Sequence, residues 1–257
     1  MLRKELLDLA RNRAALVPVV IATLVSLLIP FFVLIVLPAM TGRSLAADPA
    51  LEFASRGGGF SDVPARIRVP AFLFQQFLIL FMLTPITGAM SLAAHAVVGE
   101  KQNRTLEPLL ATPLTTIELL VAKVLGALLP TFAISLAGLL LYVLGIVLWE
   151  PQTALAAMLT GRTLVLALLV GPAAALVSLQ SAIVISSRVN DPRTAQQFGV
   201  LIVVPLTFVF VGQLVGALWL PVWMLVVIGL AMLVVWVLLT LFTVALFDRE
   251  SILTRWR

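Results

Sequence analysis

The feature that most constrains this chain is a series of six long apolar runs with almost no Asp, Glu, Lys or Arg inside them. A helix needs about 20 apolar residues to cross the hydrocarbon core of a bilayer. A helix also satisfies every backbone polar group within such a run. We therefore predict an all-α membrane protein, a single domain over residues 1–257 with six transmembrane helices at about residues 14–40, 69–98, 119–149, 163–187, 198–220 and 221–247.

Composition agrees with a chain that lies mostly in lipid. Hydrophobic residues make up 61% of the chain and charged residues 11%, whereas soluble domains carry about 25% charged residues. The runs leave only short loops and tails, which excludes a separate soluble domain. The net charge of +5 is typical of cytoplasmic loops beside anionic lipid, so we expect contact with the lipid bilayer and not with nucleic acid. The absence of Cys excludes disulfides and thiolate metal sites.

The distribution of positive charge predicts the orientation. With the N-terminus in the cytoplasm, the inner segments hold twelve Lys and Arg residues and the outer segments hold five. This excess predicts that both termini are cytoplasmic. Trp149, Trp219 and Trp223 fall at predicted outer ends, where aromatic residues anchor helices at the membrane surface. The six-span count depends on a turn before Pro221, which cannot continue the incoming helix; without that turn there are five spans, with the tails on opposite sides.

Two segments outside the spans have their own character. Residues 2–13 form either a short amphipathic helix at the membrane interface or a charged cytosolic tail. A cleaved signal peptide is disfavoured because the following apolar run is longer than a typical signal sequence allows. Residues 41–68 form the one sizeable outer loop, and we expect three consecutive glycines at 57–59 to make its middle flexible.

The chemistry that the chain lacks limits its function. No charged residue lies deep in a predicted span, whereas ion-coupled carriers keep a titratable group there. His95 lies near the inner end of the second span, as either a proton relay or a polar helix cap. The chain has no GxxxxGK[ST] phosphate loop, so it cannot hydrolyse ATP alone. We therefore expect no catalytic residues and no metal site.

Several polar residues nevertheless lie within the predicted spans. They either line a substrate route or form hydrogen bonds between helices, and the sequence leaves both interpretations open. The candidates for the pathway are Gln75, Gln76, Thr84, Ser178, Gln180 and Gln213; Ser91 and Ser181 are further polar residues within the spans.

The long inner loop at residues 99–118 carries a short predicted helix. Thr105 can cap its start, Pro108 is tolerated in its first turn, and Pro113 disfavours its continuation. Its apolar residues recur at helical spacing and form one stripe. Such a stripe, facing the cytosol between two spans, packs back on lipid or on the bundle, or docks in a groove on a partner protein. The stripe consists of Leu106, Leu109 and Leu110.

This loop resembles a known motif. The stretches Gly99-Glu100-Lys101, Arg104-Thr105-Leu106-Glu107 and Leu109-Leu110-Ala111-Thr112-Pro113 resemble the signature cytoplasmic loop of permease subunits of type-2 ATP-binding-cassette (ABC) exporters. Weaker similarities are Arg-Thr-Ala-Gln-Gln at 193–197 and Phe-Asp-Arg-Glu at 247–250. Asn103 stands where many members have Gly, and few members have Pro at position 108. The connection near residue 220 is too short for the re-entrant helices common in the family.

The resemblance implies a division of labour between subunits. In that family the loop carries a coupling helix that inserts into a cleft on a separate cytosolic ABC ATPase. ATP and Mg are bound by that partner, and this chain binds no cofactor. A second permease subunit, identical or diverged, completes a dimer. The implied location is the plasma or inner membrane of a prokaryote. The residues assigned to coupling are Glu100, Arg104, Leu106, Glu107, Leu109 and Leu110.

The predicted function is therefore export by the permease subunit of an ABC transporter. The uncharged span interiors favour a lipid-like, drug or peptide cargo over a bare ion. The alternatives are an ATP-independent secondary carrier or channel, and a structural membrane subunit that transports nothing.

Overall fold

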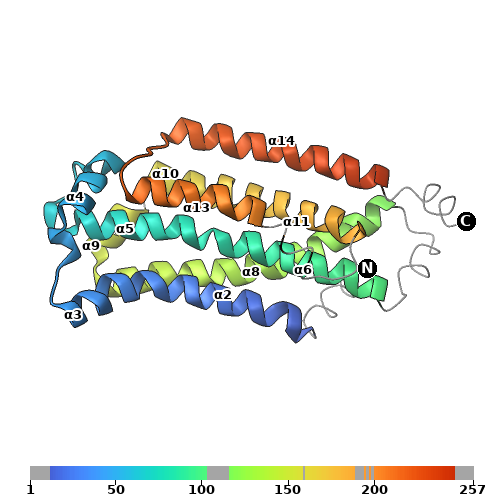
Figure 1. Ribbon diagram of the computed structural model, residues 1–257, viewed down its shortest axis with the longest axis horizontal. Helices are drawn as coiled ribbons and strands as arrows, with labels where there is room; N and C mark the ends of the chain where they lie inside the picture. Colours follow the sequence, from blue (N-terminus) through green and yellow to red (C-terminus); the bar gives the residue numbers. More distant parts are fainter. Residues whose placement is uncertain are drawn as a thin grey trace, which may run out of the picture.

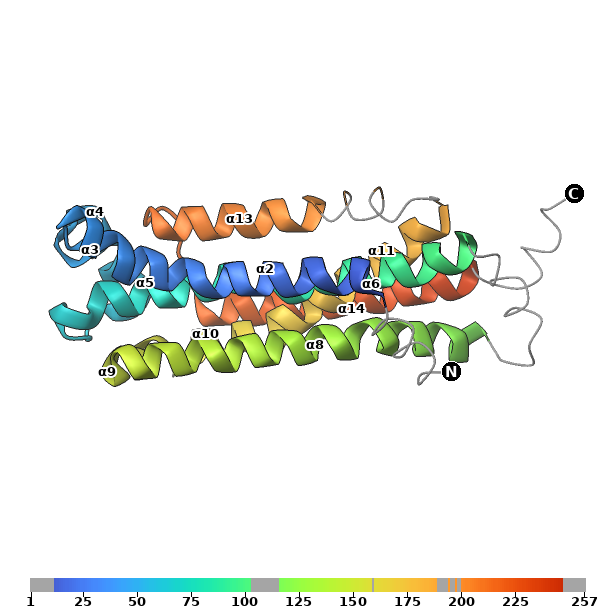
Figure 2. The same cartoon turned by 90° about the horizontal axis from the view of Figure 1, so that it is seen from below.

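Long helical rods lie side by side along the length of the molecule (Figure 1, Figure 2). The computed structural model describes residues 12–102, 116–158, 160–188, 194, 197 and 200–246. No strand occurs in these ranges. The all-α prediction is therefore confirmed for the described part of the chain.

The first rod joins α2 (Arg13–Phe31), the π-helical turn η1 (Phe32–Val36) and α3 (Leu37–Thr41). At its start the backbone amide of Ala15 donates to Asn12 Oδ1 at 3.2 Å, an N-cap that satisfies an otherwise unpaired donor. Pro30 lacks a backbone donor, and the wide π turn follows it directly, as expected where the helical ladder is interrupted.

Three further rods run the length of the bundle. The second joins α5 (Ala65–Phe81) to α6 (Leu83–Gln102), and the third is α8 (Thr116–Trp149). The fourth joins α10 (Gly161–Val165), the π-helical turn η4 (Leu166–Val170) and α11 (Gly171–Arg188). The rod of α5 and α6 lies at the centre of the bundle, because most of its apolar stretch is buried against the other helices. The predicted spans at 69–98, 119–149 and 163–187 lie within these rods.

The last two helices are α13 (Val200–Leu214) and α14 (Val222–Leu246). In the described ranges, five helical segments are long and apolar enough to cross a membrane, and α14 is the last of them. The 15 residues of α13 span only about 22 Å at 1.5 Å per residue, less than the roughly 30 Å of a bilayer core. The predicted run at 198–220 therefore extends beyond the helix that the structure describes.

The early end of α13 has a local cause. Gly216 adopts the left-handed conformation, with φ 78°. The backbone amide of Gly216 donates to the carbonyl of Gln213 at 3.1 Å, and that of Ala217 donates to Gly212 at 2.8 Å. This pair of bonds is the Schellman motif that closes a helix. The predicted turn before Pro221 is present, but the helix already ends at Leu214, six residues before the predicted boundary at 220.

Short helices cover one end of the bundle. They are η2 (Leu45–Ala47), α4 (Pro49–Ser55), η3 (Arg56–Phe60) and α9 (Pro151–Met158). We call this the capped end. The opposite, far end holds the start of α2 and the ends of α6 and α14 (Figure 1). Trp149 is the last residue of α8, Trp219 lies in the connection after α13, and Trp223 lies at the start of α14, so all three lie at the capped end.

Two of the three cap glycines, Gly57 and Gly58, pack tightly within the π-helical turn η3, where we expected a flexible loop, whereas a Cβ at Gly59 would meet nothing within 4 Å. A Cβ atom at Gly57 would lie 2.7 Å from the indole nitrogen of Trp219, and one at Gly58 would lie 2.7 Å from its ring carbons. The Trp219 ring also lies against Phe72, with centroids 5.9 Å apart. Gly57 and Gly58 need to be glycine because the indole fills the space that a side chain would occupy. Because the same ring contacts Phe72, Trp219 joins the cap to α5.

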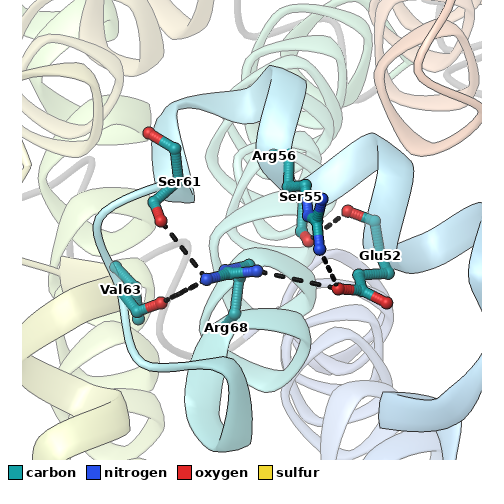
Figure 3. Close-up of polar contacts among 6 residues, drawn as sticks. All are labelled: Glu52, Ser55, Arg56, Ser61, Val63 and Arg68. Carbon is teal, nitrogen blue, oxygen red and sulfur yellow. Dashed lines mark hydrogen bonds and ion pairs between the residues drawn. The ribbon is translucent and has the colours of Figure 1, made fainter.

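Arg68 ties the cap to the start of α5 (Figure 3). Its guanidinium donates to the carbonyl oxygens of Ser61 at 3.2 Å and Val63 at 3.0 and 3.1 Å. Its Nη1 lies 3.7 Å from Glu52 Oε1, the same oxygen that accepts from Arg56 Nη2 at 2.6 Å. This arginine thus has acceptors on both sides of its guanidinium.

Apolar side chains cover much of the outside of the bundle. On α14, Leu230, Val234, Leu238 and Leu241 are all half exposed or more, and they recur at helical spacing. A face of this kind is not stable in water. Its exposure agrees with a helix that borders lipid or a second membrane subunit.

Candidate functional site

The predicted coupling loop joins two rods at the far end. α6 ends at Gln102 and α8 begins at Thr116, both at that end (Figure 1). Glu100 belongs to the backbone of α6 near its end. The other assigned coupling residues lie outside the described residues: Arg104, Leu106, Glu107, Leu109 and Leu110. The predicted interfacial helix at residues 2–13 also lies almost entirely outside them.

Gln75 belongs to a polar cluster near the capped end. Its Nε2 donates to Thr160 Oγ1 at 2.7 Å and to Thr163 Oγ1 at 3.0 Å. The Thr163 hydroxyl in turn donates to the carbonyl of Ala157 at 2.9 Å. Gln75 Oε1 is buried and has no hydrogen-bond partner among the described residues. The cluster joins α5 to the connection between α9 and α10.

Gln76 belongs to α5 and Gln213 to α13, two helices that pack against each other. The rings of Phe77 and Phe210 meet across these helices, with centroids 6.0 Å apart. Gln76 directly precedes Phe77, and Gln213 lies one turn beyond Phe210. Both glutamines are fully buried, and in the described part of the chain neither amide oxygen nor amide nitrogen has a hydrogen-bond partner. Such unpaired buried polar atoms are costly unless something else occupies them.

The remaining predicted pathway residues lie nearer the far end. Ser178 Oγ donates to the carbonyl of Ala174 at 2.8 Å, within α11. Gln180 Nε2 donates to Thr243 Oγ1 at 2.7 Å and joins α11 to α14. Thr84 is buried at the start of α6, and its hydroxyl has no partner among the residues that the structure describes. The six predicted residues therefore do not converge on one site.

An apolar pocket opens where two rods are interrupted. It has a volume of about 130 Å³. It lies beside Met82, between α5 and α6, and beside Leu168 in η4. Ser135 of α8 also lines it, and the Ser135 hydroxyl is buried without a hydrogen-bond partner in the described ranges. The pocket is thus an apolar space with one polar group in its wall.

His95 and Lys123 lie together toward the far end. His95 Nδ1 lies 2.9 Å from the carbonyl of Ser91, and Lys123 Nζ donates to the carbonyl of Ala96 at 3.5 Å. Each thus contacts a backbone carbonyl of α6, an interaction that suits a helix end. No group of three His, Cys, Asp or Glu side chains that could hold a metal occurs within the described ranges.

Arg162 is a candidate functional residue that is absent from the predicted site residues. We counted it as a charge of an outer loop, but it begins α10 with only 8% of its surface exposed. Its guanidinium carbon lies 5.7 Å from the centroid of the Trp219 ring. Its Nε and Nη2 are buried and have no hydrogen-bond partner among the described residues. The one sequence signal is its position between Thr160 and Thr163, at the start of an apolar run.

The apolar rods, the exposed apolar faces and the buried polar residues define a multi-pass helical membrane protein. Comparison with known families identifies it further. The family described as "ABC-2 family transporter protein" matches residues 1–221. The chain therefore belongs to this family of ABC transporter membrane proteins, as the inner-loop resemblance predicts. No curated protein and no solved structure gives a match to the chain.

Proposed function

We propose that this chain is the permease subunit of an ABC exporter that moves a lipid-like, drug or peptide cargo with energy from a separate ATPase subunit. The observation that carries the proposal is the family match over residues 1–221. The sequence of this chain has no phosphate loop, so in this proposal the ATP and Mg bind to the partner. ATP binding would close an ATPase dimer, and the inner loops of two permease subunits would transmit that motion to the bundle.

The proposed orientation places the capped end outside and the far end in the cytosol. The distribution of Lys and Arg supports it, as does the gathering of Trp149, Trp219 and Trp223 at the capped end. We infer six crossings with α13 as part of the fifth, because α13 lies beside α5 within the bundle. An even number of crossings also agrees with the start of α2 and the end of α14 lying at the same end (Figure 1).

The proposed pathway runs along the buried polar atoms that lack partners. Gln76, Gln213 and Thr84 are the first candidates, because their polar atoms are buried and the described residues leave them unpaired. Gln75, Ser178 and Gln180 each donate a hydrogen bond within the bundle. These three therefore support helix packing as well as any contact with cargo.

Coupling is proposed to depend on the leucine stripe of the inner loop, with Glu100, Arg104 and Glu107 orienting the contact through charge pairs. Leu109 and Leu110 would insert into an apolar groove on the ATPase, so replacing them with aspartate would bury unpaired charge there. We expect Leu109→Asp and Leu110→Asp together to abolish co-purification with the ATPase.

The control is Ala111→Asp, which adds one negative charge on the opposite face of the predicted loop helix. This variant should retain the ATPase. All variants should elute from size-exclusion chromatography at the wild-type volume, which shows that the permease itself folds. An intact complex in the double variant would show that the leucine stripe does not dock the ATPase.

A further inference from the structure

Arg162 presents a buried guanidinium that pairs with no carboxylate of the described residues. The residue is 8% exposed, and its Nε and Nη2 have no hydrogen-bond partner within the described ranges. No salt bridge joins it to any carboxylate of the described residues. Its guanidinium carbon lies over the face of Trp219, 5.7 Å from the ring centroid. An aromatic face attracts a cation but accepts no strong hydrogen bond.

Three arginines in or beside the cap show how other cations of this end are paired. Arg68 donates to two backbone carbonyls and faces Glu52 (Figure 3). Arg56 pairs with the same Glu52 at 2.6 Å. Arg66 is 88% exposed and lies 3.3 Å from Glu150. Each of these three cations has a carboxylate, whereas Arg162 is more buried than any of them and pairs with no carboxylate of the described residues.

A buried charge without a partner costs several kcal/mol. In membrane proteins such a residue is a mark of function more often than of stability. A guanidinium has planar, forked donors that match the oxygens of a phosphate or a carboxylate in two parallel hydrogen bonds. The two unpaired nitrogens, Nε and Nη2, are neighbours on one edge of that fork. They can therefore take one oxyanion together.

The surroundings suit a molecule with both an anionic and an apolar part. Trp219 lies over the guanidinium, and Phe72 packs against Trp219 with ring centroids 5.9 Å apart. Thr160 and Thr163 flank Arg162 in sequence and hold the Gln75 amide. Trp219 lies between α13 and α14, in a connection of residues 215–221 without helix.

We propose that Arg162 binds the anionic headgroup of an amphiphile, with Trp219 packed over it at the capped end of the bundle. The headgroup is a phosphate or carboxylate, and the tail lies along the apolar side chains beside Phe72. If this amphiphile is also the transported cargo, that identification rests on the proposed function. The binding itself requires no ATPase.

The site is tested with purified protein in an uncharged detergent, by native mass spectrometry during titration with phosphatidylglycerol. Wild type should bind one molecule with preference over dioleoylglycerol, which has similar tails and no anion, and over inorganic phosphate, which has no tail. Arg162→Gln should weaken phosphatidylglycerol binding roughly tenfold or more, the loss expected for a charged hydrogen bond. Arg162→Lys should recover part of the affinity. The control, Arg66→Gln, removes the same charge from the same end and should bind within about twofold of wild type.

A melting temperature measured with and without phosphatidylglycerol separates binding from folding. Without lipid, Arg162→Gln should melt at or above the wild-type temperature, because it removes an unpaired buried charge. With lipid, only wild type, Arg66→Gln and, in part, Arg162→Lys should gain stability. A lower melting temperature of lipid-free Arg162→Gln would make Arg162 structural and overturn the proposal. Equal phosphatidylglycerol affinity in Arg162→Gln and wild type would also overturn it, as would equal affinity for free phosphate. None of these results bears on attachment of an ATPase.

Discussion

The hydroxyl of Tyr142 on α8 donates to the backbone carbonyl of Phe74 on α5 at 2.7 Å. The Tyr142 ring is fully buried, and it meets the rings of Phe31, Phe74 and Phe81 with centroids 5.9 to 6.1 Å apart. One side chain thus joins α2, α5 and α8 through both a hydrogen bond and aromatic packing. The centre of the bundle depends on this ring.

Substitution of Tyr142 separates these two contributions. Tyr142→Phe removes only the hydroxyl, and we expect a loss of about 0.5–1.5 kcal/mol in the free energy of unfolding. Tyr142→Ala removes the ring and leaves a cavity, with an expected loss of about 3–5 kcal/mol. Thermal unfolding in detergent, followed by loss of the monodisperse peak, measures both. Equal effects of the two substitutions would contradict this assignment.

Close approach of α8 to its neighbours requires a small residue at position 138. A Cβ on Gly138 would lie 2.7 Å from Thr23 Cγ2 and 2.9 Å from Phe81 Cζ. Gly138→Val should therefore force the helices apart and cost roughly 1–3 kcal/mol of stability. The control is Gly161→Ala, because a Cβ there meets nothing within 4 Å. Its melting temperature should equal or exceed that of wild type, while Gly138→Val should melt lower.

The hydrogen bond between Gln180 and Thr243 tests which polar residues serve packing. A double-mutant cycle with Gln180→Met and Thr243→Val should give a coupling of about 0.6 kcal/mol, and at most about 1.7 kcal/mol, the range for hydrogen bonds between membrane helices. The double variant should retain transport.

By contrast, Gln76→Leu and Gln213→Leu should reduce transport without lowering the melting temperature, because no partner among the described residues is lost. If transport is lost in the Gln180→Met and Thr243→Val double variant but kept in the Gln76→Leu and Gln213→Leu variants, the pathway runs along the hydrogen-bonded residues and not along the unpaired ones.

The absence of Cys from the chain makes its topology directly measurable. A membrane-impermeant maleimide should label Ser61→Cys in intact cells, because Ser61 is exposed at the capped end. Asn103→Cys and Thr254→Cys should be labelled only after the membrane is permeabilised. Labelling of Thr254→Cys from outside would mean an odd number of crossings and would exclude six spans.

The long helices could be predicted because charged residues mark their ends. The apolar stretches between Arg13 and Arg43 and between Arg68 and Glu100 bound the first two rods within a few residues. The end of α13 could not be predicted in the same way. Apolar residues continue past Leu214, and only the left-handed turn at Gly216 stops the helix.

The candidate site was predictable in part. Polar residues inside apolar runs were identified from sequence, and all six are buried. Their partners were not, because a hydrogen bond such as that of Gln75 with Thr160 depends on packing between segments distant in sequence. Arg162 was assigned to a loop because charge next to a polar segment usually indicates a surface. Its burial depends on Trp219, 57 positions further along the chain.

The central claim is that this chain forms a transport pathway powered by a separate ATPase. The most direct measurement is a pull-down of the detergent-solubilised protein from its native membranes, with the attached proteins identified by mass and assayed for ATP hydrolysis. We expect an ABC ATPase in stoichiometric amount. Its absence under mild solubilisation, with the permease recovered intact, would contradict the proposed function and favour an ATP-independent carrier or a structural subunit.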